Sequence, residues 1–527
     1  MKMYYLLSLI PAFCYLLFKS KKAMHMLQQN WYNDGNRYID WIFNNKKKVF
    51  LIIDLLFILI LLLDGYKAMI VFMIMNILFF YNCDKKYKNE QSKKPLVITA
   101  RIKRLYATLI IVYVLLVYVT TVLWFNEQGL SFYYFYVGLI IYLNYLFVYL
   151  CNVINKPIEK MVFNHFKRMA TLKLESMTNL KKIAITGSYG KTSTKNILND
   201  ILNVKYNSFA TPASYNTMNG LMISINNKLD KFTDVFIAEM GAFTQGEIKR
   251  KTQFIKPQYG ILTTIGTAHL ESFGSRENIQ KAKFELIDGL PSDGVAILNM
   301  DDEYQTSYKV KSKCKIIWVS IDNKEADVYA KDIKLSSKGT EFKCYIKGLK
   351  DPITLETKLL GSANVYNILE CVALAYELGL SAEQIQIGVR RVKTIEHRLE
   401  LKKFGDIDII DDAYNSNPVG SKMAVDVLGL MDGKKIIVTP GMIELGEKQY
   451  EYNNEFGKQI AKVCDEVILI GKEQTKPIYD GLIESKFDEE HIHILNDVKL
   501  AFPLMKRLSR GKTFVLLEND LPDIFNE

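Results

Sequence analysis

Long apolar runs crowd the first third of the chain, and short charged segments separate them. The runs lie at residues 4–18, 50–63, 68–81, 105–125 and 132–154. The last two exceed the roughly 20 residues that a helix needs to cross a bilayer. Each of the first three is shorter, so a buried hairpin or an interfacial helix is an alternative to a span. The pattern predicts an α-helical membrane domain with about five helices.

Positive charge is distributed unevenly between these runs. The segments at residues 19–48 and 85–104 are rich in lysine and arginine, whereas residues 64–67 and 126–130 carry almost none. Basic loops of membrane proteins stay on the cytoplasmic side. With five spans, this rule places the N-terminus outside the cell and everything after residue 154 in the cytoplasm.

Three polar residues, Asp54, Asn76 and Asn144, interrupt the apolar runs. Ionisable groups inside a membrane are functional candidates, which leaves a transporter or a membrane sensor open as a reading from another class. Asp54 follows closely after the basic residues 46–48, so we expect its side chain to reach the membrane interface.

From residue 181 onward, short strand-like runs alternate with helical stretches. The runs KIAIT, DVFIAEM, YGILTTI, GVAILNM and CKIIWVS predict a doubly wound α/β domain with a parallel sheet. A second set, IDIIDDAY, KKIIVTP, EVILIG and TFVLLEND, predicts a smaller Rossmann-like α/β domain. The expected boundaries are 1–154 for the membrane domain, 155–180 for a helical segment, 181–398 for the central domain and 399–527 for the C-terminal domain.

The helical segment at residues 155–180 is charged and has one apolar face. It is either a juxtamembrane amphipathic helix or an ordinary linker helix that packs on the domain after it.

Composition excludes two classes of function. The net charge of +11 is explained by membrane topology and anionic lipids, and the chain lacks the interleaved basic and aromatic residues of a nucleic-acid binder. The seven cysteines are scattered without a C-x-x-C spacing. We therefore expect reduced thiols, with neither disulfides nor a zinc site.

The sequence KIAITGSYGKTST at residues 182–194 joins an apolar strand to a Gly-Lys-Thr loop and a helix. Gly187 and Gly190 allow backbone N–H groups to close around phosphate, Lys191 supplies a positive charge, and Thr192 offers a hydroxyl to Mg²⁺. The loop is the short form T-G-x-x-G-K-T-S. We predict a binding site for the phosphates of ATP, to which Ser188 and Ser193 also belong.

Seven blocks of sequence, in order, resemble those of the Mur ligases. They are TGSYGKTS, IAEMGAFTQGEI, GTAHLESFGS, KAKFEL, ILNMDD, DDAYNSNP and GMIELGE. The chain looks most like the branch that adds D-Ala-D-Ala to the peptidoglycan precursor, over residues 181–527. The resemblance implies a bacterial ligase that transfers the γ-phosphoryl of ATP to a carboxylate and lets an amine attack the acyl phosphate.

The resemblance also implies two Mg²⁺ sites. Glu239 would share the first ion with Thr192, and His269 would hold the second together with a carbamylated lysine. Lys283 is the matching lysine, whereas Lys281 is a rival, and either could instead be a solvated helix lysine. The implied catalytic residues are Lys191, Glu239, His269, Lys283 and Arg398.

The nucleotide contacts implied by the resemblance come from both α/β domains. Asn299 would read the adenine, although a plain turn at a strand end would look similar. Arg398 would hold a phosphate when the domains close, although His397 stands where the family usually has glycine. Asp411 and Tyr414 would contact ribose and adenine.

In the block GSANVYNIL, Ala363 stands where the family usually has histidine. Asn364 and Asn367 remain, and Asn364 is kept as a nucleotide contact.

Two departures from the family bear on the substrates. The UDP-sugar-binding N-terminal domain of the family has no room between the last predicted span and residue 181. This favours a carboxylate on a lipid-linked precursor or a nascent envelope glycan. LLENDLPD also replaces the usual Lys-Gly-Ser motif, so Glu518, Asn519 and Asp520 should disfavour a carboxylate-bearing amine such as D-Ala-D-Ala.

The leading hypothesis is therefore a multi-pass ligase of the bacterial cell membrane with cytoplasmic catalytic domains. It would join an amino acid or peptide to a glycan carboxylate. The alternatives are the D-Ala-D-Ala-adding ligase itself, a polyglutamate-type ligase, and a nucleotide-driven transporter or sensor. Motor NTPases normally add an arginine finger or a dimer signature, and we find neither.

Overall fold

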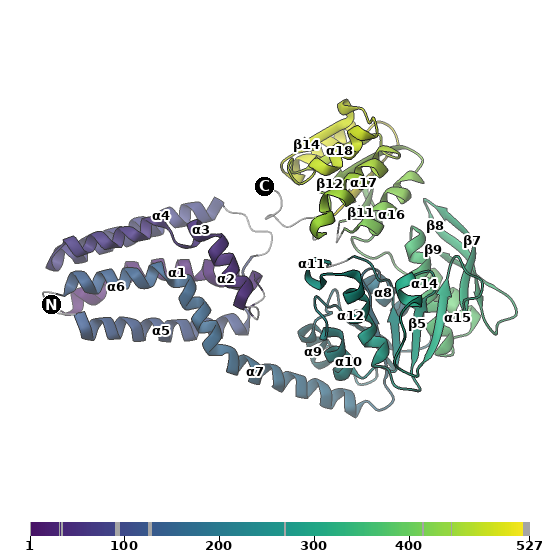
Figure 1. The fold of residues 1–527 in the computed structure, drawn as a ribbon, viewed down its shortest axis with the longest axis horizontal. Coiled ribbons are helices and arrows are strands. Elements are labelled where there is room, and N and C mark those ends of the chain that lie inside the picture. Colours follow the sequence, from purple (N-terminus) through teal and green to yellow (C-terminus); the bar gives the residue numbers. More distant parts are fainter. Residues whose placement is uncertain are drawn as a thin grey trace. The chain divides into compact units, whose positions relative to one another are not determined.

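The computed structural model of the 527-residue chain describes residues 2–30, 32, 35–89, 95–124, 129–267, 270–413, 416–443 and 445–519. The chain forms two compact units, Met1–His165 and Phe166–Glu527 (Figure 1). The first unit is helical, and the second contains two β-sheets covered by helices.

The helical unit consists of seven helices and the start of an eighth within the part of the chain that the structure describes. They are α1 (Lys2–Gln29), α2 (Gly35–Asn44), α3 (Lys46–Val49), η1 (Ile52–Leu62), α4 (Gly65–Asn89), α5 (Ala100–Trp124), α6 (Leu130–Tyr142) and α7 (Asn144–Ser176). Helix α7 is continuous and carries the chain into the second unit.

Within the described residues, fewer helices are long and apolar enough to span a membrane than the five we predicted. Segments Gly65–Lys85 of α4 and Ala100–Leu123 of α5 are long and apolar enough to cross a bilayer. Helices α6 and α7 are bent by 68° and would count as a third only if the pair is one broken span. The apolar run at residues 50–63 instead forms the 11-residue 3₁₀ helix η1, which is too short to span.

A buried ion pair joins α1 to η1. Lys19 Nζ lies 2.5 Å from Asp54 Oδ2, and Tyr15 donates a hydrogen bond of 2.7 Å to Asp54 Oδ1. Asp54 is only 2% exposed. Our expectation that Asp54 reaches an interface is therefore wrong, because a carboxylate can stay buried when a cation and a hydroxyl satisfy it.

Polar groups also meet at the break between α6 and α7. Lys19 Nζ donates to the carbonyl of Ile141, near the end of α6, at 3.0 Å. Asn144, the first residue of α7, accepts hydrogen bonds from Ser20 Oγ at 2.9 Å and from Tyr113 OH. Carbonyl groups at a helix end lack intrahelical partners, so Lys19 adds a charged donor at the end of α6.

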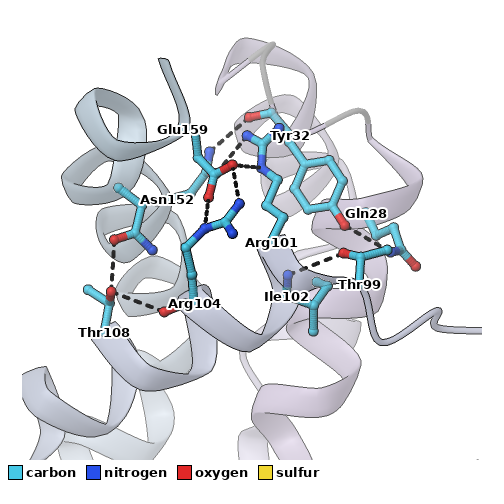
Figure 2. A network of polar contacts seen from close by, with 10 residues as sticks. Gln28, Tyr32, Thr99, Arg101, Ile102, Arg104, Thr108, Asn152 and Glu159 are labelled. Atoms are coloured by element: carbon cyan, nitrogen blue, oxygen red, sulfur yellow. Dashed lines mark hydrogen bonds and ion pairs between the residues drawn. The ribbon is translucent and has the colours of Figure 1, made fainter. Parts of the chain in front are cut away.

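The beginning of α5 is fastened to α7 by the contacts drawn in Figure 2. Arg104 Nε and Nη2 each donate to Glu159 at 2.8 Å, and Arg101 Nε lies 4.0 Å from the same carboxylate. Thr108 Oγ1 donates to Asn155 Oδ1 at 2.8 Å. Two-point pairing of a guanidinium with a carboxylate fixes orientation as well as distance. The two helices are therefore held in register over this stretch.

The last part of α7 belongs to the α/β unit and contacts the end of α9 (Met218–Asn227). Asn226 Nδ2 donates to the carbonyl of Phe166 at 3.0 Å, and Lys173 Nζ donates to the carbonyl of Asn226 at 3.4 Å. Over this stretch α7 acts as a linker helix. Leu172 is 55% exposed on the same helix, so an apolar face also remains.

The first sheet of the α/β unit has nine strands in the order β2-β3-β1-β4-β5-β6-β7-β8-β9. The strands β1 to β6 pair in parallel, as the alternating pattern predicted, and β7 to β9 extend the sheet as an antiparallel meander. Their bounds are β1 (Lys181–Thr186), β2 (Ser208–Ala210), β3 (Val235–Glu239), β4 (Tyr259–Leu262), β5 (Val295–Asn299), β6 (Lys315–Ser320), β7 (Val328–Ser336), β8 (Gly339–Ile346) and β9 (Ile353–Thr357).

Helices cover both faces of this sheet. Ile261 belongs to the core beneath α8, α14 and α15, whereas a Cβ on its neighbour Gly260 would face Leu290, Ile287 and Leu286 at the end of α12. Alternate residues of a strand point to opposite faces, so the domain is doubly wound. The helices are α8 (Lys191–Leu202), α9 (Met218–Asn227), α10 (Glu247–Ile255), α11 (Leu270–Phe273), α12 (Arg276–Asp288), α13 (Glu303–Thr306), α14 (Ser362–Glu377) and α15 (Ala382–Arg391).

The second sheet has six strands in the order β10-β11-β15-β12-β13-β14, and only the edge strand β10 is antiparallel. This arrangement agrees with the predicted second α/β domain. The strands are β10 (Glu400–Phe404), β11 (Ile407–Asp412), β12 (Lys434–Thr439), β13 (Glu466–Ile470), β14 (Ile492–Leu495) and β15 (Thr513–Glu518), and the α-helices are α16 (Pro418–Gly429), α17 (Gln449–Ala461), α18 (Lys476–Glu484) and α19 (Ala501–Leu508).

The ion pair of the helical unit gives a test of its core. Lys19→Met leaves the Asp54 carboxylate buried without a cation, so we expect a loss of about 3–5 kcal/mol in unfolding free energy. The double variant Lys19→Met/Asp54→Leu removes both charges and should recover most of the loss. Thermal unfolding in detergent, followed by far-UV circular dichroism, measures both, with the exposed Lys48→Met as control. A double variant no more stable than Lys19→Met would contradict this account.

Candidate active site

The loop at residues 187–190 leaves the carboxyl end of β1, and α8 begins directly after it. Gly187 has a φ of +151°, and a Cβ there would lie 2.0 Å from Thr263 Oγ1. Gly190 has a φ of +80°, and a Cβ there would lie 2.7 Å from Asn367 Oδ1. Both positions need glycine, for conformation and for space. The loop therefore presents backbone rather than side chains, as a phosphate cradle requires.

Lys191 closes back over this loop. Its Nζ donates to the carbonyls of Gly187 at 2.8 Å and Ser188 at 2.9 Å. Burial lowers the pKa of Lys191 to about 8, opposed by the Glu239 carboxylate and assisted by the charge of Arg398. At neutral pH the side chain is therefore still mainly a cation, placed against the loop where phosphate charge would accumulate.

Glu239 ends β3 and is 1% exposed. Its Oε2 accepts hydrogen bonds from Thr192 Oγ1 at 3.1 Å and from Lys195 Nζ at 3.0 Å, and its Oε1 accepts one from Asn216 Nδ2 at 3.1 Å. The structure thus brings together Thr192 and Glu239, the two residues predicted to share a magnesium ion.

Thr192 and Glu239 can supply only some of the ligands of a Mg²⁺ ion. Among the described residues, no group of three or more His, Cys, Asp or Glu could hold a metal. Mg²⁺ is usually bound through one or two protein oxygens, with water and substrate phosphates completing the octahedron. The carboxylate of Glu239 and the hydroxyl of Thr192 match that pattern.

Lys283 lies on the inner side of α12 and is 3% exposed. Burial, followed by the charges of Lys191 and Lys251, holds its pKa well below the usual range. Lys281 is exposed on the other side of the helix, where it lines a surface cavity of about 890 Å³. Its burial beside other cations makes Lys283 a better candidate for carbamylation than the exposed Lys281, and the modification itself stays a prediction. His269, its predicted partner, lies outside the described residues.

The predicted adenine contact, Asn299, stands at the end of β5. Its Oδ1 accepts a hydrogen bond from the N–H of Asp301 at 2.9 Å, so the residue forms the strand-end turn that we named as the alternative. Asp302 accepts from the N–H of Ile265 at 2.8 Å and ties this turn to the segment after β4. A role for Asn299 in base recognition stays a prediction.

Asn364 and Asn367 face inward from α14. Asn364 Nδ2 donates to the carbonyl of Leu360 at 2.8 Å, and Asn367 Nδ2 donates to Asn364 Oδ1 at 3.1 Å. Asn367 Oδ1 accepts from Thr194 Oγ1 at 3.1 Å, on the helix that follows the loop. Asn367, held by Asn364, therefore packs against Gly190 and the start of α8 and so supports the phosphate loop.

Residues at the boundary of the two α/β domains form a compact polar group. His397 has a φ of +57°, and its Nδ1 lies 2.8 Å from Asp411 Oδ2, which also accepts from Lys402 Nζ at 2.8 Å. Burial alone would raise the pKa of Asp411, but the hydrogen bonds from Lys402 and His397 hold it below its usual value. Asp411, the predicted ribose contact, is thus already paired with His397 and Lys402 at the domain boundary. Tyr414 lies outside the described residues.

Arg398 connects the two domains electrostatically. Its charge lowers the pKa of Lys191 in the central domain. It also opposes the burial that raises the pKa of Asp412, in the C-terminal domain, to about 6. The boundary arginine therefore interacts electrostatically with Lys191 of the central domain and with Asp412 of the C-terminal domain, and its contact with phosphate stays a prediction.

Glu518 does not belong to an open substrate loop. It is the last residue of β15 and is buried, and its carboxylate accepts hydrogen bonds from Ser416, Ser421 at 2.8 Å and Thr439 at 2.9 Å. The expectation that Glu518 disfavours a carboxylate-bearing amine is therefore wrong, because its charge is enclosed by hydroxyl donors. Asp520 lies outside the described residues.

Two residues that contact the site were missed in the sequence. Lys195 lies one helical turn after Lys191 in KTSTK, and Asn216 lies in the loop ASYNT after β2. The i, i+4 spacing of the lysines on an amphipathic helix was the available signal for Lys195. Nothing local marked Asn216, because its partner Glu239 is far along the chain.

The α/β unit matches known proteins along most of its length. The family described as Mur ligase middle domain matches residues 185–375, and the family described as Mur ligase, glutamate ligase domain, matches residues 397–517. Both matches leave out the helical unit.

Related proteins are about 30% identical to this chain within the aligned stretch. The UDP-N-acetylmuramoyl-tripeptide–D-alanyl-D-alanine ligase of Bacillus subtilis (strain 168) is 32% identical over 55% of this chain and 62% of its own length. The Haemophilus influenzae ligase of the same name is 31% identical over 65% of this chain and 74% of its own length. The chain thus spans somewhat less than two thirds of the Bacillus relative.

Solved structures agree with these matches. MurF from Acinetobacter baumannii superposes with a TM-score of 0.61 at 26% identity, over 68% of this chain and 77% of that one. MurF ligase from Thermotoga maritima, solved in complex with ADP, gives 0.60 at 25% identity, over 68% and 80%. The α/β unit therefore shares both the fold and part of the sequence of these ligases.

The buried Glu518 carboxylate makes stability depend on pH. Burial raises its pKa to about 7, against roughly 4.3 in an unfolded chain. The protonated Glu518 stabilises the fold fully below about pH 4, and this contribution to the unfolding free energy, about 4 kcal/mol, is lost as pH rises through about 7. Glu518→Gln stays neutral, so we expect it to be more stable than the natural protein at pH 8 and to show a weaker decline.

Thermal unfolding midpoints between pH 5 and pH 8 measure this difference. Glu490→Gln, at an exposed position of the same domain, is the matched control and should follow the natural protein. A Glu518→Gln variant with the same pH profile as the natural protein would show that the carboxylate titrates normally.

Proposed function

We propose that this chain, which belongs to the Mur ligase family, uses ATP to join D-alanyl-D-alanine to the carboxylate of a peptidoglycan precursor. The observation that carries the proposal is the buried Glu239 carboxylate, placed against Thr192 and beside the Lys191 loop. The names of the relatives supply the two substrates. The order of our hypotheses is thereby reversed, since these matches support the D-Ala-D-Ala reading better than a glycan acceptor.

The reaction has two displacements. A carboxylate oxygen of the acceptor attacks the γ-phosphorus of ATP, and ADP leaves with the bridging oxygen. The amine nitrogen then attacks the acyl carbon, phosphate leaves with the bond electrons, and the nitrogen loses a proton to give the amide. Both steps bring anions together, so catalysis consists mainly of positioning and charge neutralisation.

The residues of the central domain fit these requirements. Lys191 places its cation against the phosphate loop, and the loop backbone surrounds the phosphates. Thr192 and Glu239 would hold magnesium, which when bound neutralises phosphate charge. Lys283 would carry a carbamate and, with His269, a second magnesium ion.

The reaction also requires that water be kept away from the acyl phosphate, which would otherwise hydrolyse. The segment that joins the two α/β domains could provide this by acting as a hinge. His397 and Leu399 have left-handed backbone conformations with φ of +57° and +49° on either side of Arg398. Closure of the C-terminal domain about these residues would bring Arg398 to the phosphates and Asp411 and Tyr414 to the nucleoside.

The helical unit supports a membrane location. We propose that the apolar helices of this unit, α4 and α5 among them, hold the ligase in the bacterial cell membrane and that its α/β unit lies in the cytoplasm. This unit also favours a second candidate function, in which the acceptor carboxylate is on a lipid-linked precursor or nascent glycan rather than on a soluble nucleotide sugar.

A direct assay tests the proposal. The full chain in detergent, given ATP and Mg²⁺, should release phosphate and form the amide from UDP-N-acetylmuramoyl-tripeptide and D-alanyl-D-alanine, read by mass spectrometry. Lys191→Ala should reduce the rate at least about 100-fold. Turnover restricted to a lipid-linked acceptor would support the second candidate, and hydrolysis of ATP without any amide product would overturn both.

Carbamylation of Lys283 can be tested through its chemistry. A depressed pKa increases the share of uncharged amine, whose nitrogen adds to CO₂ and releases a proton to give an anionic carbamate. Lys283→Ala should lower kcat about 100-fold or more, and added formate or acetate should restore part of it by replacing the lost carboxylate.

Lys281→Ala is the matched control, two residues away on the exposed side of α12, and should retain its rate within about twofold. Equal losses in both variants, or no rescue of Lys283→Ala by small carboxylates, would count against a carbamate at Lys283.

A further inference from the structure

A second lysine of α8 is buried beneath the phosphate loop. The Lys195 side chain is 1% exposed, and its Nζ lies 3.0 Å from Glu239 Oε2. The same nitrogen donates a hydrogen bond to the carbonyl of Ala213. Its cation therefore sits between the carboxylate predicted to bind metal and the loop that follows β2.

Lys195 is the ion-pair partner of that carboxylate. The other two contacts to the Glu239 oxygens come from Thr192 and Asn216, which carry no charge. A buried carboxylate is costly unless a cation compensates it. Lys195 thus neutralises Glu239 within the folded protein.

The same side chain orders the loop at residues 211–217. Ala213 has a φ of +42°, which is unfavourable for any residue except glycine, and its carbonyl accepts from Lys195. Asn216, in this loop, donates to Glu239 Oε1 and accepts at its own carbonyl from the N–H of Gly241 at 3.0 Å. The loop and the carboxylate form one hydrogen-bonded unit around Lys195.

The pairing of Lys195 with Glu239 determines the net charge at the proposed metal site. Glu239 and Lys195 together are neutral, so they offer a free divalent cation little attraction. A nucleotide brings several negative charges to the adjacent loop and changes that balance. The order in which ligands enter the site then depends on the lysine.

We infer that Lys195 is a positioning residue that neutralises Glu239 and thereby makes metal binding depend on nucleotide. This inference rests on the proposed magnesium–nucleotide site and adds a role that the phosphate-loop sequence alone does not assign. Removal of the charge frees the carboxylate for a metal ion in the absence of nucleotide, while the loop at residues 211–217 loses a tether.

The test uses Mn²⁺ as a spectroscopic substitute for Mg²⁺ and the full chain in detergent. Lys195→Gln keeps a hydrogen-bond donor for Ala213 but removes the charge, and Lys195→Arg keeps the charge. Electron paramagnetic resonance titration without nucleotide should show that Lys195→Gln binds Mn²⁺ at least about tenfold more tightly than the natural protein and Lys195→Arg. Glu239→Gln in the Lys195→Gln background should abolish the gain.

Two results would overturn the inference. One is equal Mn²⁺ affinity in Lys195→Gln and Lys195→Arg, with folding verified by circular dichroism. The other is a gain that survives Glu239→Gln, because the metal would then bind elsewhere. Failure of the proposed function is distinguishable, since it would appear as the absence of amide product in the ligase assay, whatever the Mn²⁺ affinities of the variants.

Discussion

The α/β unit depends on the burial of one carboxylate, Glu239, at the carboxyl end of β3. A buried charge requires hydrogen-bond or ion-pair partners, and three side chains from two segments of the chain supply them. Thr192 and Lys195 come from the first turns of α8, which fixes how that helix leaves the phosphate loop. Asn216 comes from the loop after β2. The orientation of these elements therefore follows from the need to satisfy a single ion inside a parallel sheet.

The phosphate loop is held by a second constraint, close packing against neighbours that leave no space for side chains. Thr263 and Asn367 approach Gly187 and Gly190 so closely that any Cβ would collide. Thr263 comes from the segment after β4, and Asn367 comes from α14, which is remote in sequence. The loop is thus preformed by the sheet and by a helix on one of its faces, and a nucleotide would find its backbone already shaped.

The sequence was most informative where a signal is local. Continuous apolar runs correctly predicted β1, β3 to β6 and the inner strands of the second sheet, because strands buried on both faces contain few polar residues. The meander β7 to β9 was missed, since its residues alternate between buried and exposed. Pairings between distant residues were equally invisible, which is why Asp54 was expected at an interface and Glu518 in an open loop.

Each unit contains a buried lysine–carboxylate pair, and the two pairs differ in a way that explains their roles. In the helical unit, Asp54 is satisfied by Lys19 and Tyr15, and Lys19 also satisfies a helix-end carbonyl. Both members of that pair make their contacts within the helical unit. The pair fixes which helices pack together, which apolar surfaces alone would not specify. In the α/β unit, Glu239 shares its oxygens with a lysine and with two uncharged donors beside a glycine loop. In the proposed site a metal ion would bind between Thr192 and Glu239 in place of their hydrogen bond. The same type of interaction would then be structural in one unit and serve metal binding in the other.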